Sequence, residues 1–150
     1  MTGEVTLLVA DDDEGHALLV SRNLRRGGLD NEMLFFRDGQ EVLDFLLGQG
    51  PCPHRQAGHP YLLLLDIRMP KVDGVDVLRA VKADPVLRRM PVFMVTTTDD
   101  PREISRCHDL GCNGYLTKPV LYERFVECVK QLGGFLGVLQ VPPLDEGKSP

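Results

Sequence analysis

The sequence predicts an α/β domain built on a five-stranded parallel sheet with helices on both faces. Three observations predict it. Short apolar runs alternate five times with amphipathic segments, the run Tyr61–Leu65 is apolar throughout, and 150 residues suit one domain. Uninterrupted apolar runs are typical of central parallel strands, because such strands are covered on both faces. With 43% hydrophobic and 26% charged residues, neither wholesale disorder nor a fibrous repeat is expected.

Two strand–helix units are predicted in the first third of the chain. Strands are expected at 5–10 and 31–36. A helix over 14–26 is indicated by apolar residues at near-helical spacing, and the pair Gly27-Gly28 ends it. Asp38 is a suitable cap for a second helix, whose apolar face holds Val42, Leu43, Leu46 and Leu47. The segment 48–60 is rich in Gly and Pro and is predicted to be an exposed loop.

Three more units follow. The strand Tyr61–Leu65 leads to a helix over 75–82, which Asp84-Pro85 breaks. A strand at 91–95 leads to a helix over 101–110, which Gly111 stops. A short strand at 114–116 leads to a last helix over 120–132, and the tail from Gly133 is expected to fray at its end.

Five strands joined through five helices predict a doubly wound sheet. Parallel strands need crossover connections, and these are right-handed. The expected result is the flavodoxin-like strand order 2-1-3-4-5, in which ligands bind at the carboxyl ends of the first and third strands. This rule indicates where the chemistry should lie.

Polar residues follow four of the predicted strands. Asp11, Asp12 and Asp13 follow the first, Asp66 the third, Thr96 the fourth and Lys118 the fifth. Each alone has a structural explanation, such as a helix cap, a strand-ending hydroxyl or a surface lysine. Together, carboxylates that repel one another call for a cation, and Mg²⁺ suits carboxylates, carbonyls and phosphate. Carboxylates, Mg²⁺, a lysine and a hydroxyl indicate phosphoryl transfer to an aspartate.

At this point the sequence resembles the receiver domain of two-component response regulators, from about residue 6 to 132. The acid pair is Asp11-Asp12 in LLVADDDEGHALL, and the phosphoacceptor position is Asp66 in LLLLDIRMPKVDG. The hydroxyl position falls on Thr96 in PVFMVTTT, and the lysine position on Lys118 in GYLTKPV. The aromatic switch position falls on Tyr115, and the bond before Pro119 is cis in the family.

The resemblance implies a role for each of these residues. Asp66 would accept a phosphoryl group from a phosphohistidine of a sensor histidine kinase. Asp12 and Asp66 would bind Mg²⁺ through side chains, Arg68 through its backbone carbonyl, and Asp11 mainly through metal-bound water. Lys118 would contact the acyl phosphate, while Thr96 and Tyr115 would move toward it and switch a protein-interaction face.

Within the family, the segments LLVADDDEGHALL, KADPVLRRMPVFMVTTTDD and GCNGYLTKPV look like the stand-alone receivers of bacterial phytochrome kinases. Such regulators are often homodimers. The division expected is a receiver domain at 1–135 and a C-terminal extension at 136–150, partly apolar and then disordered. The apolar residues from Leu136 to Val141 either fold back on their own core or form a subunit contact. A contact across the face of the fourth and fifth helices is the other candidate for a dimer.

Composition limits the other functions. The net charge of −5 disfavours nucleic-acid binding, and the residues after 132 are too few for a DNA-binding output domain. No signal peptide or membrane span is recognised, so a cytoplasmic protein with reduced cysteines is expected. Cys52, His54 and His59, and likewise Cys107, His108 and Cys112, lack the paired spacing of zinc ligands.

Several alternatives to a forward-signalling receiver stay open. A phosphate sink or phosphorelay intermediate would use the same site. A phosphohydrolase of the haloacid dehalogenase type would need an acid where Arg68 stands. A nucleotide- or flavin-binding domain would need a glycine-rich loop where DDDEG stands. A degenerate receiver that only binds partners would not need intact Asp11, Asp12, Asp66, Thr96 and Lys118.

Overall fold

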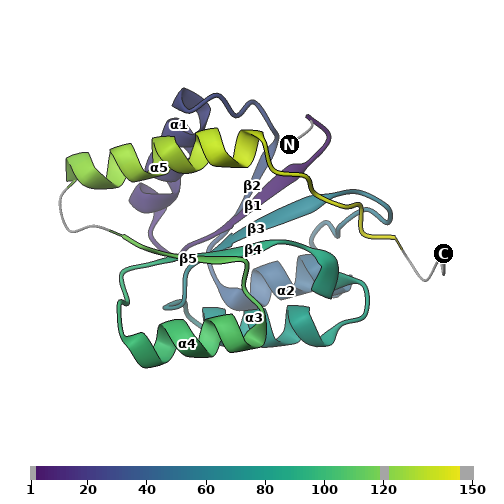
Figure 1. Ribbon diagram of the computed structural model, residues 1–150. Coiled ribbons are helices and arrows are strands. Elements are labelled where there is room, and N and C mark those ends of the chain that lie inside the picture. The colour runs from purple at the N-terminus through teal and green to yellow at the C-terminus, as the bar shows by residue number, and fades with distance from the viewer. Residues whose placement is uncertain (1–2, 119–121, 146–150) are drawn as a thin grey trace.

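The computed structural model describes residues 3–118 and 122–145, and its elements alternate between strand and helix along the chain (Figure 1). The elements are β1 (Thr6–Ala10), α1 (Glu14–Arg26), β2 (Met33–Phe36), α2 (Gly39–Leu47), β3 (Tyr61–Leu65), α3 (Gly74–Ala83), the 3-10 helix η1 (Leu87–Arg89), β4 (Val92–Thr96), α4 (Pro101–Leu110), β5 (Gly114–Thr117) and α5 (Tyr122–Gly137). No helix in these two ranges is both long and apolar enough to cross a bilayer.

The five strands form one parallel sheet in the order β2-β1-β3-β4-β5, which confirms the predicted topology. β1 and β3 lie side by side in the centre, with Ala10 opposite Leu65 at their carboxyl ends. The residues that follow these two strands are therefore neighbours, although they are far apart in the sequence.

The sheet separates two hydrophobic cores. Helices α1 and α5 cover one face, and α2, α3 and α4 cover the other (Figure 1). Along β3, Leu62 and Leu64 belong to the core under α1 and α5, while Leu63 and Leu65 belong to the core under α2, α3 and α4. Successive side chains of a strand point to opposite faces. The uninterrupted apolar run of β3 therefore has a direct cause, since both of its faces are buried.

Aspartates cap the N-termini of four helices. The side chains of Asp13, Asp38, Asp73 and Asp100 each accept a hydrogen bond from a backbone N–H in the first turn of α1, α2, α3 and α4. Capping of this kind satisfies donors that have no partner within the helix. The prediction of a cap at Asp38 is confirmed.

Helix α5 is longer than predicted. The helix was predicted over 120–132, with a tail from Gly133, but it continues to Gly137, so that end was wrong. Gly133 is buried where α5 crosses α1, and its backbone lies against Leu24 and Gly27. A glycine here allows two helices to approach closely, and burial of Leu136 in the core beyond it stabilises the extra turn.

The segment after α5 folds back on the domain. Leu139 and Val141 pack against the α1–α5 core, and Leu144 is fully buried in the other core. Leu144 is held by two backbone hydrogen bonds, from Gly58 N to Leu144 O at 2.9 Å and from Leu144 N to His59 O at 3.3 Å. Of the two accounts of this apolar segment, packing on its own core is the one that the structure shows. Val138 stays 76% exposed.

Three expectations lie outside the described residues. The cis bond before Pro119 and the predicted helix start at residue 120 fall within 119–121, and the frayed chain end falls within 146–150. The division into 1–135 and 136–150 stays a prediction.

The neighbouring glycines of α5 provide a test of its packing. A Cβ at Gly133 would lie 2.9 Å from the Leu24 carbonyl oxygen, whereas a Cβ at Gly134 meets nothing within 4 Å. We expect Gly133→Ala to lower the free energy of unfolding by about 1–2 kcal/mol, because backbone must move. Gly134→Ala should raise it by about 0.5–1 kcal/mol, because alanine favours the helix. Urea denaturation measures both, and equal effects would contradict the packing of α1 on α5.

Candidate functional site

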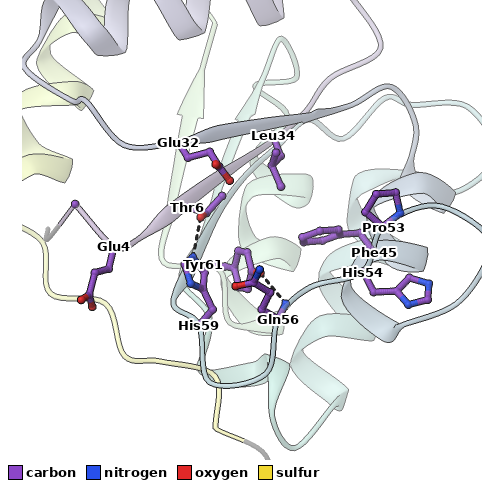
Figure 2. A pocket seen from close by; sticks show the side chains of 11 residues that line it. Glu4, Thr6, Glu32, Leu34, Phe45, Pro53, His54, Gln56, His59 and Tyr61 are labelled. Atoms are coloured by element: carbon purple, nitrogen blue, oxygen red, sulfur yellow. Dashed lines mark hydrogen bonds between the residues drawn. The ribbon is translucent and has the colours of Figure 1, made fainter.

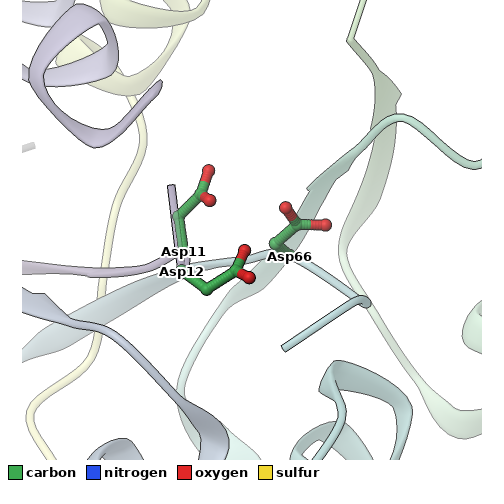
Figure 3. A group of neighbouring side chains, drawn as sticks. All are labelled: Asp11, Asp12 and Asp66. Carbon is green, nitrogen blue, oxygen red and sulfur yellow. The ribbon is translucent and has the colours of Figure 1, made fainter. Parts of the chain in front are cut away.

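The residues predicted to form the site meet at one edge of the sheet. Asp11 directly follows β1, Asp66 directly follows β3, Thr96 is the last residue of β4, and Lys118 directly follows β5. Figure 3 shows the carboxylates of Asp11, Asp12 and Asp66 gathered at the ends of β1 and β3. Asp11, Asp66, Thr96 and Lys118 are all buried, and Asp12 is exposed.

The ammonium group of Lys118, which follows β5, contacts the carboxylates at the ends of β1 and β3. Its Nζ donates to Asp11 Oδ2 at 2.7 Å and to Asp66 Oδ2 at 3.1 Å. The Lys118 side chain is only 4% exposed, so these are buried, charge-assisted contacts. The backbone of Lys118 is fixed as well, because its N–H donates to the Thr96 carbonyl oxygen at 2.6 Å. A lysine in this place fixes the separation between the two carboxylates.

Burial and charge act in opposite directions on the pKa values at this edge. Burial lowers the pKa of Lys118, but the hydrogen bond and charge of Asp11 and the charge of Asp66 outweigh it, so the pKa is raised. The ammonium group therefore stays charged. The pKa of Asp11 is also raised, because the cost of burying its carboxylate exceeds what the Lys118 hydrogen bond returns. One lysine does not fully compensate the acidic cluster.

The acidic cluster fits a divalent cation. Asp11, Asp12 and Asp66 each offer one carboxylate oxygen, and these oxygens lie within 4.8 Å of one another. Carboxylate oxygens are ligands that Mg²⁺ and Mn²⁺ accept. Asp12 is on the exposed side of the cluster, so a cation would enter there without unpacking the core. Elsewhere in the described ranges, no other trio of His, Cys, Asp or Glu gathers in this way, including the Cys and His groups of the sequence analysis.

The loop after Asp66 is held tightly over the strand end. The N–H of Gly74 donates to the Ile67 carbonyl oxygen at 2.7 Å, and a Cβ at Gly74 would overlap the Asp66 carbonyl oxygen. Only glycine fits so close to another backbone. Asp73 caps α3, with Asp76 N donating to its Oδ1 at 3.0 Å. These two residues of the motif therefore shape the loop and do not belong to the carboxylate cluster.

Thr98 links the remaining predicted residues. The Tyr115 hydroxyl donates to the Thr98 carbonyl oxygen at 2.6 Å, and Arg68 Nε donates to Thr98 Oγ1 at 3.3 Å. Thr98 N in turn donates to Thr96 Oγ1 at 3.4 Å. Burial raises the pKa of Tyr115 to about 12, so its hydroxyl keeps its proton. The loop after β4 thus connects Thr96 with the aromatic ring on β5.

His16 is at the site, although the sequence analysis did not include it. It lies in the first turn of α1, and its Nδ1 is 3.2 Å from Lys118 Nζ. Its ring also lies beside Phe125 of α5, with centroids 5.9 Å apart. The available signal in the sequence was its place one turn after the acid pair, where the start of α1 faces the same edge.

A larger hollow lies at the other end of the sheet and contains none of the predicted site residues. Figure 2 shows its lining, which includes Thr6 and Tyr61, the first residues of β1 and β3. Its volume is about 440 Å³, and the Thr6 hydroxyl contacts His59 Nε2 at 2.8 Å inside it. Choosing the site by cavity size alone would therefore have selected this hollow and missed the charged cluster.

Comparison with known proteins identifies the class. Residues 7–130 match the response regulator receiver domain, so the chain belongs to this family. The match covers every predicted site residue and all of the sheet except Thr6, the first residue of β1.

Two curated relatives are similar over most of the chain. The response regulator Rcp1 of Synechocystis sp. is 35% identical over 112 residues, which are 75% of this chain and 75% of Rcp1. The probable methanogenesis regulatory protein FilR2 of Methanothrix harundinacea is 34% identical over 128 residues, covering 84% of this chain and 79% of that protein.

Solved structures agree in fold. A response regulator receiver domain from Rhodospirillum rubrum is 47% identical, with a TM-score of 0.88 over 94% of this chain and 99% of that one. The phosphorylated cyanobacterial phytochrome response regulator RcpA is 30% identical, with a TM-score of 0.82 over 91% and 97%. The Mn²⁺-bound form of Rcp1 is also 30% identical, with a TM-score of 0.80 over 91% and 98%. The chain is thus close to phytochrome response regulators.

Two adjacent acids provide a test of cation binding. Asp12 belongs to the carboxylate cluster, whereas Asp13 caps α1. We expect Asp12→Asn to weaken Mg²⁺ and Mn²⁺ binding about tenfold or more, because the cluster loses one of its three carboxylates. Asp13→Asn removes the same charge one residue away and keeps a good cap, so affinity should stay within about threefold of wild type. Isothermal titration calorimetry measures both, and equal losses would contradict the assignment of Asp12.

Proposed function

We propose that Asp66 accepts a phosphoryl group from the phosphohistidine of a sensor histidine kinase. The observation that carries the proposal is the placement of Lys118 Nζ at 3.1 Å from Asp66 Oδ2, beside the acidic cluster. A carboxylate at this place is poised for attack, and a cation beside it would meet the incoming oxygens. Membership in the receiver family supports the same role.

The transfer needs no general base on this chain. A carboxylate oxygen of Asp66 forms a bond to phosphorus, and the bond from phosphorus to the histidine nitrogen of the kinase breaks with its electron pair. Lys118 then donates to a phosphoryl oxygen and continues to neutralise Asp11, its partner at 2.7 Å. The chain is in this proposal a signalling phosphoacceptor that assists its own phosphorylation and dephosphorylation.

Mg²⁺ is the cofactor that we propose for this site. Asp12 and Asp66 would hold it with their side chains, Arg68 with its backbone carbonyl, and Asp11 through bound water. The three carboxylates within 4.8 Å of one another and the raised pKa of Asp11 support a cation here. When bound, Mg²⁺ supplies positive charge to the phosphoryl oxygens.

Thr96 and Tyr115 are proposed to report the phosphorylation state. The fully buried Thr96 would donate its hydroxyl to a phosphoryl oxygen, giving up its contact with Thr98 N. The Tyr115 hydroxyl bonds the carbonyl oxygen of the same Thr98. A movement at Thr96 would therefore reach Tyr115 and the surface of α4, β5 and α5, where a protein partner would bind.

The kinase partner is proposed to be of the phytochrome type. The relatives Rcp1 and RcpA and the bacteriophytochrome response regulator RtBRR, which is 37% identical with a TM-score of 0.71, support this class. A cytoplasmic location and the absence of nucleic-acid or membrane partners go with it. Use as a phosphate sink or relay intermediate would involve the same Asp66. Hydrolase chemistry of the haloacid dehalogenase type is disfavoured, because Arg68 points its Nε to Thr98 and offers no acid.

Two motif aspartates provide a test of the acceptor. Asp66 lies in the carboxylate cluster, whereas Asp73 caps α3. With acetyl phosphate and Mg²⁺, wild type and Asp73→Asn should gain about one phosphoryl mass, and Asp66→Asn should gain none, because the nucleophile is lost. Intact-mass spectrometry measures the adduct. Continued labelling of Asp66→Asn would show that another residue is the acceptor.

We also propose that the protein forms a homodimer. The apolar segment after α5 covers its own core, but Phe135 is 52% and Val138 is 76% exposed near the end of α5. Exposed apolar residues three positions apart at the end of a helix suit a symmetric contact. The face of α4, β5 and α5 is the second possible interface.

Light scattering tests the dimer and its place. Wild type at high concentration should approach twice the monomer mass of 16.7 kDa. Val138→Glu should shift it toward the monomer, because a charge in an apolar contact costs hydration. Leu47→Glu, at a residue 40% exposed near the end of α2, is the matched control and should leave the mass unchanged. A wild type that stays monomeric would refute the dimer, and a dimeric Val138→Glu would exclude this interface.

A further inference from the structure

We infer that His16 is a positioning residue for Lys118, holding the third N–H of its ammonium group so that the lysine faces Asp66. The inference rests on the proposed function of Asp66 and Lys118. A lysine ammonium has three donors and no acceptor. Two of them are directed to Asp11 and Asp66, and the remaining neighbour is His16 Nδ1 at 3.2 Å. The three partners come from α1 and from the ends of β1 and β3.

The contact defines the state of the imidazole. Because Lys118 can only donate, His16 Nδ1 must carry a lone pair, and the ring proton therefore sits on Nε2. A protonated ring would place two positive groups 3.2 Å apart. Asp13 Oδ2 lies farther from the same nitrogen, at 3.7 Å, and its other oxygen accepts from His16 N at 3.1 Å. Asp13 thus fixes the backbone of His16, while the ring nitrogen Nδ1 is closer to Lys118 than to Asp13.

The imidazole is held from two more directions. The ring of Phe125 on α5 lies across from it at 5.9 Å, with the planes inclined by 48°. The start of α1 fixes its backbone through the Asp13 cap. α1 and α5 are packed together along the same face of the sheet (Figure 1). The position of His16 therefore depends on how these two helices pack, and Lys118 receives its third partner from that packing.

Positioning matters during phosphoryl transfer. When Asp66 becomes an acyl phosphate, the N–H of Lys118 that was bonded to Asp66 forms a hydrogen bond to a phosphoryl oxygen instead. The hydrogen bonds to Asp11 and His16 are kept. With its third donor bound by a neutral acceptor, the ammonium group is oriented without additional negative charge in the site. An orienting contact made before the reaction lowers the barrier, because no reorganisation is needed at the moment of transfer.

Two substitutions with the same number of side-chain heavy atoms test whether the hydrogen-bond acceptor of His16 matters. Asn places its Oδ1 near the position of Nδ1 and can accept a hydrogen bond, whereas Leu branches at the same atom and cannot accept one. With acetyl phosphate and saturating Mg²⁺, the phosphorus–acetyl oxygen bond breaks, acetate leaves, and the phosphoryl group moves to Asp66. We expect His16→Leu to be labelled about tenfold more slowly, the loss of one hydrogen bond to a charged group. His16→Asn should stay within about threefold of wild type.

Three further measurements decide between positioning and a structural role. The melting temperature and the Mg²⁺ affinity of His16→Leu should match those of His16→Asn. In ¹⁵N NMR of the unphosphorylated protein at pH 8, Nε2 of His16 should carry the proton and Nδ1 should not. Equal labelling rates for Leu and Asn, or a proton on Nδ1, would overturn the inference while labelling of Asp66 in wild type continues. A wild type that is not labelled at Asp66 would overturn the proposed function, and the inference with it.

Discussion

The buried ammonium group of Lys118 is the contact on which the arrangement of this edge depends. It bonds Asp11 and Asp66 at the ends of β1 and β3, while the backbone N–H of the same lysine bonds the Thr96 carbonyl oxygen at the end of β4. Charges taken out of water are costly unless their partners are well placed. The sheet order places those partners together, since β1 and β3 are neighbours and β4 lies next to β5. A shift of one strand by one residue would leave a buried charge without its partner.

The negative charge at the same edge of the sheet is only partly balanced by positive charge. Three carboxylates face one lysine, and burial raises the pKa of Asp11 in spite of its hydrogen bond to Lys118. A divalent cation would reduce the repulsion among the carboxylates of such a cluster, so cation binding is favoured there. A phosphoryl group adds negative charge at the same place, so cation and phosphoryl group would support one another's binding. The chemistry proposed for Asp66 thus follows from a charge imbalance built into the fold.

Support for the site comes from backbone as much as from side chains. Gly74 allows the loop after β3 to close directly on the Asp66 carbonyl oxygen, and Gly133 allows α5 to approach α1. The first contact shapes the loop beside the acceptor, and the second fixes the two helices that bring His16 to Lys118. These two glycines therefore help to determine where the charged side chains lie, because they allow close approach of backbone to backbone.

The sequence by itself determined the strand order and the residues that meet at one edge of the sheet, with strand bounds within one or two residues of the observed ones. Apolar periodicity is a local property of the sequence, and the order of parallel strands then fixes which carboxyl ends meet. Asp11, Asp12, Asp66, Thr96 and Lys118 could be chosen in this way. The length of α5 could not, since Gly133-Gly134 reads locally as a stop, and only the packing of Gly133 on Leu24 and the burial of Leu136 favour the helix. The contact between His16 and Lys118 likewise joins residues 102 positions apart. Only the tertiary structure decides such contacts, because they depend on how whole helices pack across the sheet.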